Sequence, residues 1–230
     1  MHEILKDKKT VFFDIGYTVF YPASGDWMFT NLFLALAGEQ LKKLPVPRII
    51  EARIKGEEYL LRNHLCREES VELERIKHFY EMFSSELDLG LSDEEILSVA
   101  KDHTFNAENY VKYPDVDKVL SELSKHYSLG IISDTWPSLE TKLKKHNIDK
   151  YFSFATYSFN LGVYKPDPKM FADALSKCGC DADKTVFIDD RNENLLGAAK
   201  FGITPILIDA EGDSDEETSF LKIHSLSELL

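Results

Sequence analysis

The second half of the chain alternates short apolar runs with amphipathic segments, and this alternation constrains the fold more than any other feature. The predicted strands span residues 128–133, 152–158, 185–189 and 204–209, and the predicted helices span residues 115–126, 137–146, 168–178 and 192–201. Strands that alternate with helices of this length are joined by right-handed crossovers in a parallel sheet. Continuous apolar strands fit a sheet that is buried on both faces. The sequence therefore predicts an α/β fold with a parallel sheet flanked by helices.

The first half has a different pattern after one short strand. Residues 10–14 are a β-rich apolar run, and residues 16–27 are punctuated by Gly, Pro, Ser and Asp, as is typical of a loop. Amphipathic helices are then predicted over residues 27–41, 47–65, 69–87 and 92–105, and Ser92 with Glu95 predicts a capping box for the last. We expect a discontinuous α/β core, residues 1–20 and 110–230, with a helical domain of residues 21–109 inserted after the first strand.

Composition restricts the partners and the compartment. The formal net charge of −13 argues against nucleic acid or an anionic membrane as a partner. The N-terminal segment lacks the apolar core of a signal peptide, and no apolar run approaches the roughly 18 residues of a membrane span. We therefore expect a cytoplasmic protein. The acidic segment 209–220 is predicted to be a solvated loop.

The three cysteines, Cys66, Cys178 and Cys180, do not form an even framework, and we expect reduced thiols. The Cys-Gly-Cys spacing at 178–180 fits neither a zinc site nor a CxxC motif. The sequence gives it no assigned chemistry.

Polar residues follow the predicted strands at the point where each strand ends. They are Asp14, Ser133, Asp134, Asp189 and Asp190. Open α/β sheets bind ligands at the edge formed by the carboxyl ends of their strands. Two adjacent carboxylates repel each other there unless a cation or a base offsets the charge. Lys165 in "GVYKPDP" is a further polar residue of interest, although most lysines lie at the surface. We therefore expect a functional site at this edge.

In their order and spacing these motifs resemble those of the haloacid dehalogenase superfamily of hydrolases, over essentially the whole chain. The matching segments are "DIGYT" with Asp14 and Thr18, "IISD" with Ser133, "GVYKPDPKMF" with Lys165, and "VFIDDRNENLLGAAKFG" with Asp189, Asp190 and Asn194. The resemblance implies a Rossmann-like core and makes residues 21–109 an α-helical cap domain of the kind that closes over a substrate.

By this resemblance the protein is a phosphatase of a small phosphorylated metabolite. Asp14 would be the nucleophile, forming an aspartyl phosphate. Magnesium (Mg²⁺) would be held by Asp14, the backbone carbonyl of Gly16 and Asp190, and Asp189 would position Lys165 or hold a metal-bound water. The residues implied for phosphate binding are Thr18, Ser133, Asp134 and Lys165. Asn194 would fix the loop or an outer-shell water.

Gly16 departs from the family pattern, because most phosphatases of the family have an acid/base Asp there, and Tyr17 stands where glycine is usual. The alternatives left open are a dehalogenase-like or phosphonatase-like hydrolase and a binding or regulatory module. A phosphonatase would need a cap amine, and Lys42, Lys43 and Lys55 lie in the insert. Cap residues that could contact a substrate are Trp27, Arg62, His64 and Arg67. The sequence leaves the oligomeric state open.

Overall fold

The computed structural model describes residues 1–212 and 218–230 and divides the chain into two compact units. An α/β unit contains Met1–Tyr21, Lys112–Thr135 and Leu143–Leu230, and a helical unit contains Pro22–Val111 and Trp136–Lys142. Part of the acidic segment predicted as a solvated loop, residues 213–217, lies outside the described residues.

Six parallel strands form the sheet of the α/β unit, in the order β5-β4-β1-β6-β7-β8. The strands are β1 (Thr10–Phe13), β4 (Ser128–Ser133), β5 (Phe152–Tyr157), β6 (Thr185–Asp189), β7 (Thr204–Ile208) and β8 (Leu221–Ile223). The helices of this unit include α5 (Val116–Leu123), α7 (Ser158–Leu161), α8 (Pro168–Cys178) and α9 (Asn192–Ala199), and 3₁₀ turns span Glu3–Leu5, Asp149–Tyr151, Ala182–Lys184 and Leu226–Leu229. The predicted α/β class with a parallel sheet is confirmed, whereas β8 and α7 were not predicted.

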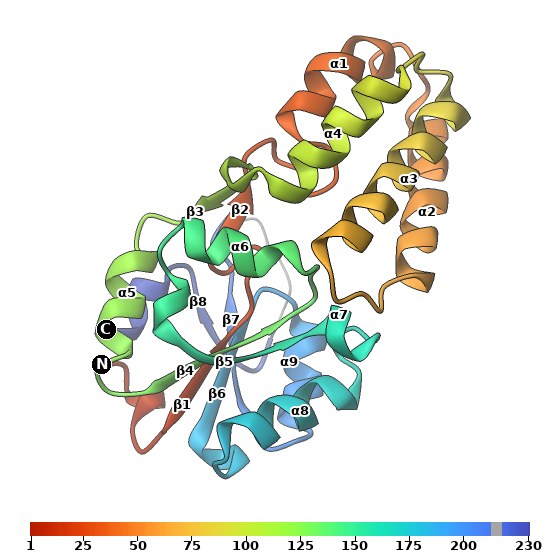
Figure 1. The fold of residues 1–230 in the computed structure, drawn as a ribbon. Helices are drawn as coiled ribbons and strands as arrows, with labels where there is room; N and C mark the ends of the chain where they lie inside the picture. The colour runs from red at the N-terminus through yellow and green to blue at the C-terminus, as the bar shows by residue number, and fades with distance from the viewer. Residues whose placement is uncertain (213–217) are drawn as a thin grey trace. The chain divides into compact units, whose positions relative to one another are not determined.

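Helices cover the sheet on both faces, with α8 and α9 on one side and α5 on the other (Figure 1). The core between the sheet and the α8–α9 layer is rich in aromatic side chains, including Phe12, Phe171 and Phe187, none of which is exposed. Gly130 in β4 is required by this packing, because a Cβ atom there would lie 2.2 Å from the ring of Phe154 and 2.9 Å from that of Phe12. Burial on both faces therefore explains why the strands read as continuous apolar runs.

The helical unit has a separate core. Its helices are α1 (Asn31–Leu41), α2 (Val46–Arg62), α3 (Glu69–Leu87) and α4 (Asp93–Phe105), and Ser92 and Glu95 form the predicted capping box at the start of α4. Phe33, Phe79 and Phe83 are fully buried at its centre. A 3₁₀ turn at Ala107–Asn109 precedes β3 (Tyr110–Lys112), which pairs with β2 (Phe20–Pro22) in a separate two-stranded sheet. No described helix combines the length and the apolar character needed to cross a membrane.

Trp136–Lys142, which the sequence prediction placed in the α/β core, packs with the helical unit. This segment contains the first turns of α6 (Ser138–Lys145), and the buried carboxylate of Glu72 in α3 holds it. The backbone N–H and the hydroxyl of Ser138 donate to Glu72 at 2.8 and 2.6 Å. Lys142 Nζ in turn donates to Ser138 Oγ at 2.8 Å. These partners lie far apart in the sequence, and hydrophobic periodicity carries no signal for such a polar contact.

Candidate functional site

Three neighbouring strands deliver polar residues to one edge of the sheet. Asp14 directly follows β1, and its backbone N–H donates to Ile188 O of β6 at 2.9 Å. Ser133 ends β4 and Asp189 ends β6, and both side chains are buried. Because β1 lies between β4 and β6, the predicted residues converge at the carboxyl ends of the strands.

Lys165 reaches into this group from the loop before α8. Its Nζ donates to Asp14 Oδ1 and to Asp189 Oδ2, each at 2.7 Å, and to the backbone carbonyl of Ile132 at 3.2 Å. The Lys165 side chain is only 2% exposed. Burial alone would lower the pKa of Lys165, but the carboxylates of Asp14, Asp189 and Asp134 outweigh that effect and raise it. The ammonium group is therefore fixed and charged between two carboxylates.

Asp189 is held by several donors of the α/β unit. Its Oδ1 accepts hydrogen bonds from the backbone N–H of Arg191 at 2.8 Å and from Asn194 Nδ2 at 3.0 Å. Its Oδ2 accepts from Asn194 Nδ2 at 3.2 Å as well as from Lys165. Three donor groups thus make four hydrogen bonds to the two oxygens, which is the geometry of a residue that orients Lys165.

Two loops beside the site are held by buried or half-buried side chains. Asp134 Oδ1 accepts the backbone N–H of Lys165 at 2.9 Å, and burial raises the pKa of Asp134. Ser158, fully buried at the start of α7, accepts the N–H of Thr135 at 2.8 Å through its hydroxyl. Sequence reasoning missed Ser158, because a serine at the end of a strand gives no signal of a contact 23 residues away.

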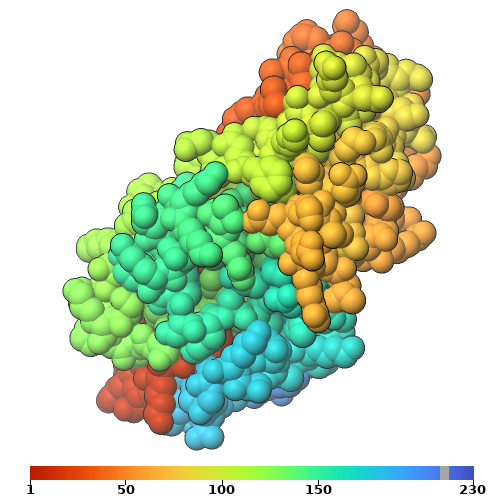
Figure 2. Space-filling view, viewed as in Figure 1, coloured from red at the N-terminus to blue at the C-terminus, as the bar shows by residue number. Residues whose placement is uncertain are grey.

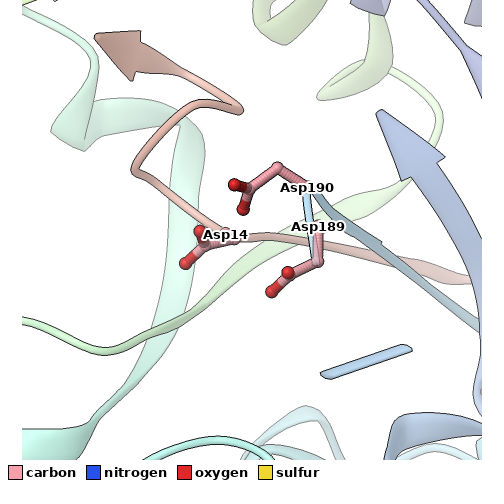
Figure 3. A group of neighbouring side chains, drawn as sticks. All are labelled: Asp14, Asp189 and Asp190. Atoms are coloured by element: carbon pink, nitrogen blue, oxygen red, sulfur yellow. The ribbon is translucent and has the colours of Figure 1, made fainter. Parts of the chain in front are cut away.

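Three carboxylates gather at this edge, as Figure 3 shows for the ends of β1 and β6. Carboxylate oxygens of Asp14, Asp189 and Asp190 lie within 4.8 Å of one another, and no other group of three potential metal ligands occurs in residues 1–212 and 218–230. Burial raises the pKa of Asp14 to about 7, although Lys165 opposes the rise. Burial, followed by repulsion from Asp14 and Asp189, raises the pKa of Asp190 to about 8.

This donor set fits a hard divalent cation. The group contains three carboxyl groups and one buried ammonium group, whose ion pairs are with Asp14 and Asp189, so its acidic groups outnumber the positive charge that offsets them. Oxygen donors are the ligands that magnesium and calcium prefer, and a divalent cation would remove the repulsion that raises the pKa of Asp190. Asp14 and Asp190 are the carboxylates best placed to bind it, because the protein already saturates Asp189.

The loop after Asp14 is a compact turn. Tyr17 N–H donates to Phe20 O at 2.7 Å, and the N–H groups of Val19 and Phe20 both donate to Ile15 O at 2.9 Å. Tyr17 has a φ of 52°, in the left-handed region that favours glycine, which explains why glycine is usual at this position. Gly16 does not have a positive φ, so its backbone conformation does not itself require glycine.

Thr18, predicted to bind phosphate, is completely buried, and its hydroxyl has no hydrogen-bond partner among the described residues. The buried Oδ1 of Asn194 likewise has no partner in the described part of the chain. Direct contact of Thr18 with phosphate stays a prediction.

The cap residues named from the sequence lie in the helical unit. His64 is buried with its ring centroid 4.7 Å from that of Trp136, and Trp27 packs on Tyr110 at 4.9 Å. Arg62 is exposed and pairs with Glu58, and Arg67 is also exposed. Lys42 and Lys55 form surface ion pairs with Glu39 and Glu86, and Lys43 is exposed, so this surface does not single out an amine for Schiff-base chemistry.

The chain is similar to known proteins in sequence and in fold. The family described as haloacid dehalogenase-like hydrolases matches residues 63–208, which include Ser133, Lys165, Asp189 and Asp190. The chain is 32% identical to (S)-2-haloacid dehalogenase 4A of Burkholderia cepacia over 122 residues, 51% of this chain and 53% of that protein. It is 34% identical to glyceraldehyde 3-phosphate phosphatase of Methanothermobacter thermautotrophicus over 103 residues, 43% of this chain and 45% of that protein.

The chain thus spans about half the length of the curated relatives it matches. Over 96% of both chains, the fold is similar to the crystal structure of a 2-haloacid dehalogenase from Pseudomonas syringae pv. tomato DC3000, with a TM-score of 0.64 and 24% identity. The family match covers more than half of this chain. The protein therefore belongs to the haloacid dehalogenase-like hydrolase family.

Proposed function

We propose that the protein is a metal-dependent phosphatase of a small phosphorylated metabolite, in which Asp14 attacks phosphorus. The observation that carries this proposal is the group of three carboxylates around one buried lysine, Lys165. A cluster of this charge suits a divalent cation and, through it, a phosphate group. The similarity to phosphatases of glyceraldehyde 3-phosphate and phosphoserine supports a small phosphorylated substrate.

In the first step Asp14 supplies the attacking oxygen. One oxygen of Asp14 is held by Lys165 at 2.7 Å, which fixes the carboxylate and leaves its other oxygen for the substrate. The new bond joins that oxygen to phosphorus, and the bond between phosphorus and the leaving group breaks. Lys165 offsets the charge of the phosphoryl group, and Asp189 with Asn194 keeps the ammonium group in place.

Mg²⁺ is the proposed cation, bound by Asp14, Asp190 and the backbone carbonyl of Gly16. When bound, it neutralises charge so that an anionic nucleophile can approach an anionic phosphate. A backbone carbonyl serves as a ligand whatever the side chain, so Gly16 retains this role. We assign Asp189 to positioning Lys165, because Lys165, Asn194 and the Arg191 N–H already use its oxygens.

Ser133 is proposed to donate its hydroxyl to a phosphoryl oxygen, from its place at the end of β4. Asp134 was also expected to bind phosphate, but an anionic side chain would repel that group. Its contact with the Lys165 backbone favours a role in holding the loop. Thr18 would support the turn around Gly16 from its buried position.

In the second step water attacks phosphorus and releases Asp14. An acid/base residue at position 16 would protonate the leaving group in the first step and activate the water in the second, but Gly16 offers no side chain. An alkoxide that leaves without a proton carries its full charge in the transition state. We therefore expect aryl and acyl phosphates to react much faster than sugar phosphates.

Phosphate release from a panel of phosphoesters, with Mg²⁺ and with EDTA, tests the proposal. We expect metal-dependent release that slows steeply as the leaving group becomes more basic. Absence of release from every member of the panel in Mg²⁺ would reject the phosphatase assignment. A flat dependence on the leaving group would instead show that another residue supplies the proton.

A second candidate is hydrolysis of a 2-haloacid, which the missing acid at Gly16 favours, because a halide needs no proton to leave. The matched segment of (S)-2-haloacid dehalogenase 4A supports the same candidate. Dehalogenases of this fold need no metal, so the three-carboxylate cluster counts against it. Halide release from (S)-2-chloropropionate in EDTA, measured beside the phosphate assay, separates the two activities.

A further inference from the structure

The two cysteines of the Cys-Gly-Cys segment lie together in the α/β unit. The sulfur atoms of Cys178 and Cys180 are 3.4 Å apart, and both residues are half-buried. Cys178 is the last residue of α8, and Gly179 ends the helix with a φ of 64°. Because glycine adopts this left-handed conformation readily, the chain can change direction at Gly179, and the side chains of Cys178 and Cys180 come together.

From this geometry we propose that Cys178 and Cys180 form a reversible intramolecular disulfide when the protein meets a hydroperoxide. A disulfide has an S–S distance of about 2.05 Å. The sulfur atoms therefore need to approach by a little more than 1 Å, a movement that side-chain rotation can supply. Figure 2 shows the segment that follows α8 at the surface of the α/β unit. Both cysteines are half-buried, so a small oxidant can reach them.

The surroundings favour a disulfide over a metal site. Zinc sites in proteins normally use at least three protein ligands. In the described ranges, 1–212 and 218–230, no third Cys, His, Asp or Glu joins these two sulfurs in a potential ligand group. Thr10 Oγ1 lies 3.4 Å from Cys180 Sγ, and a hydroxyl is a poor ligand for a thiophilic ion but a suitable donor to a thiolate.

The contact with Thr10 assigns Cys180 as the sulfur that is oxidised first. Its thiolate attacks one peroxide oxygen, the O–O bond breaks, and Cys180 becomes a sulfenic acid. The second oxygen leaves as hydroxide, which takes up the proton released from the Cys180 thiol to give the first water. Cys178 then attacks the Cys180 sulfur and expels the hydroxyl group, and its thiol proton completes a second water. Two thiols and one hydrogen peroxide thus give one disulfide and two waters. A dithiol reductant reverses the reaction by exchange.

Cys66 is a control within the same chain. It is 4% exposed, lies in the helical unit and donates a hydrogen bond to Glu68 O at 3.4 Å. It has no neighbouring thiol in its sequence segment. The proposal therefore predicts that two of the three thiols are lost on mild oxidation and that Cys66 remains reduced.

The test is mass spectrometry of the reduced full-length protein after treatment with hydrogen peroxide. Trypsin cleaves after Lys177 and Lys184, so both cysteines fall in the peptide 178–184, whereas Cys66 falls in 63–67. We expect the first peptide to lose two hydrogens and to regain them with dithiothreitol. The second peptide should stay unchanged.

Two variants, Cys178→Ser and Cys66→Ser, separate the role of the resolving thiol from that of a thiol outside the disulfide. Without Cys178 the sulfenic acid on Cys180 has no resolving thiol, so we expect dimedone to trap it. Cys66→Ser should leave the disulfide unchanged. If peptide 178–184 of the unaltered protein gains oxygen or links two molecules instead of losing two hydrogens, the proposal is wrong, whether or not the variants fold. The mass readout is independent of the proposed phosphatase activity.

Discussion

Lys165→Met removes the buried cation while keeping a side chain of similar length and volume. In the metal-free protein it leaves Asp14 and Asp189, each 2.7 Å from the ammonium nitrogen, without that partner. Their side chains are 10% and 0% exposed, so water cannot replace the lost contact. Breaking a buried ion pair by removing one partner typically costs about 3–5 kcal/mol. With two carboxylates affected, we expect a loss near the upper end, about 5 kcal/mol.

The pH dependence of this stability loss follows from the direction in which the pKa of Asp14 is shifted. Burial raises the pKa of Asp14, and the positive charge of Lys165 limits that rise. Without Lys165 the pKa of Asp14 therefore rises further. The folded variant then holds a proton that the unfolded chain releases near pH ~4, and its stability decreases as pH rises toward the folded-state pKa. The loss relative to the unaltered protein should therefore be smaller at about pH 5 than at about pH 8.

Urea unfolding in EDTA at these two pH values is the assay. The matched control is Lys144→Met at an exposed position of α6, which should change the free energy of unfolding by less than about 0.5 kcal/mol. Adding Asp189→Asn to Lys165→Met removes one unpaired charge and should restore part of the loss. A loss below about 1 kcal/mol at the higher pH, or an equal loss at both pH values, would refute the reasoning.

Three further predictions concern the metal and the missing acid. Asp190→Ala should raise the Mg²⁺ concentration needed for half-maximal phosphate release, and an unchanged titration would move the ligand role elsewhere. In the metal-free protein, the raised pKa values of Asp14 and Asp190, about 7 and about 8, should make the free energy of unfolding fall between about pH 4 and pH 8. Excess Mg²⁺ should reduce this dependence of the free energy of unfolding on pH. Urea titrations of the metal-free protein that show no such dependence would contradict the prediction. Gly16→Asp should accelerate alkyl phosphates by up to about 10²- to 10⁴-fold and flatten the dependence on leaving group, and rates that do not change would show that the acid is not what limits them.

The sheet and the gathering of its polar residues could be predicted because both depend on local pattern. Apolar runs fix the strands, and an acid directly after a buried strand must lie at the carboxyl edge of a parallel sheet. The adjacent pair Asp189 and Asp190 shows the limit of this reasoning. Only the structure shows that Asp189 is fully buried and accepts hydrogen bonds from three donor groups, whereas Asp190 is half-buried.

Contacts that depend on the three-dimensional path of the backbone could not be predicted in this way. Glu72 reads as a polar residue on an amphipathic helix, yet it is buried and binds Ser138, 66 residues away. The proximity of Cys178 and Cys180 depends on the backbone conformation of Gly179, which spacing alone does not fix. Each case needs the three-dimensional path of the chain.

Covalent labelling of Asp14 tests the central claim most directly. The protein is mixed with acetyl phosphate and Mg²⁺, quenched in acid within the first turnover, and digested for peptide mass analysis. We predict one added phosphoryl group on the peptide that contains Asp14, removed by hydroxylamine and absent from Asp14→Asn, whose amide cannot act as an anionic nucleophile. Phosphate release with no phosphoryl group on Asp14 at any quench time, or undiminished turnover by folded Asp14→Asn, would contradict the account.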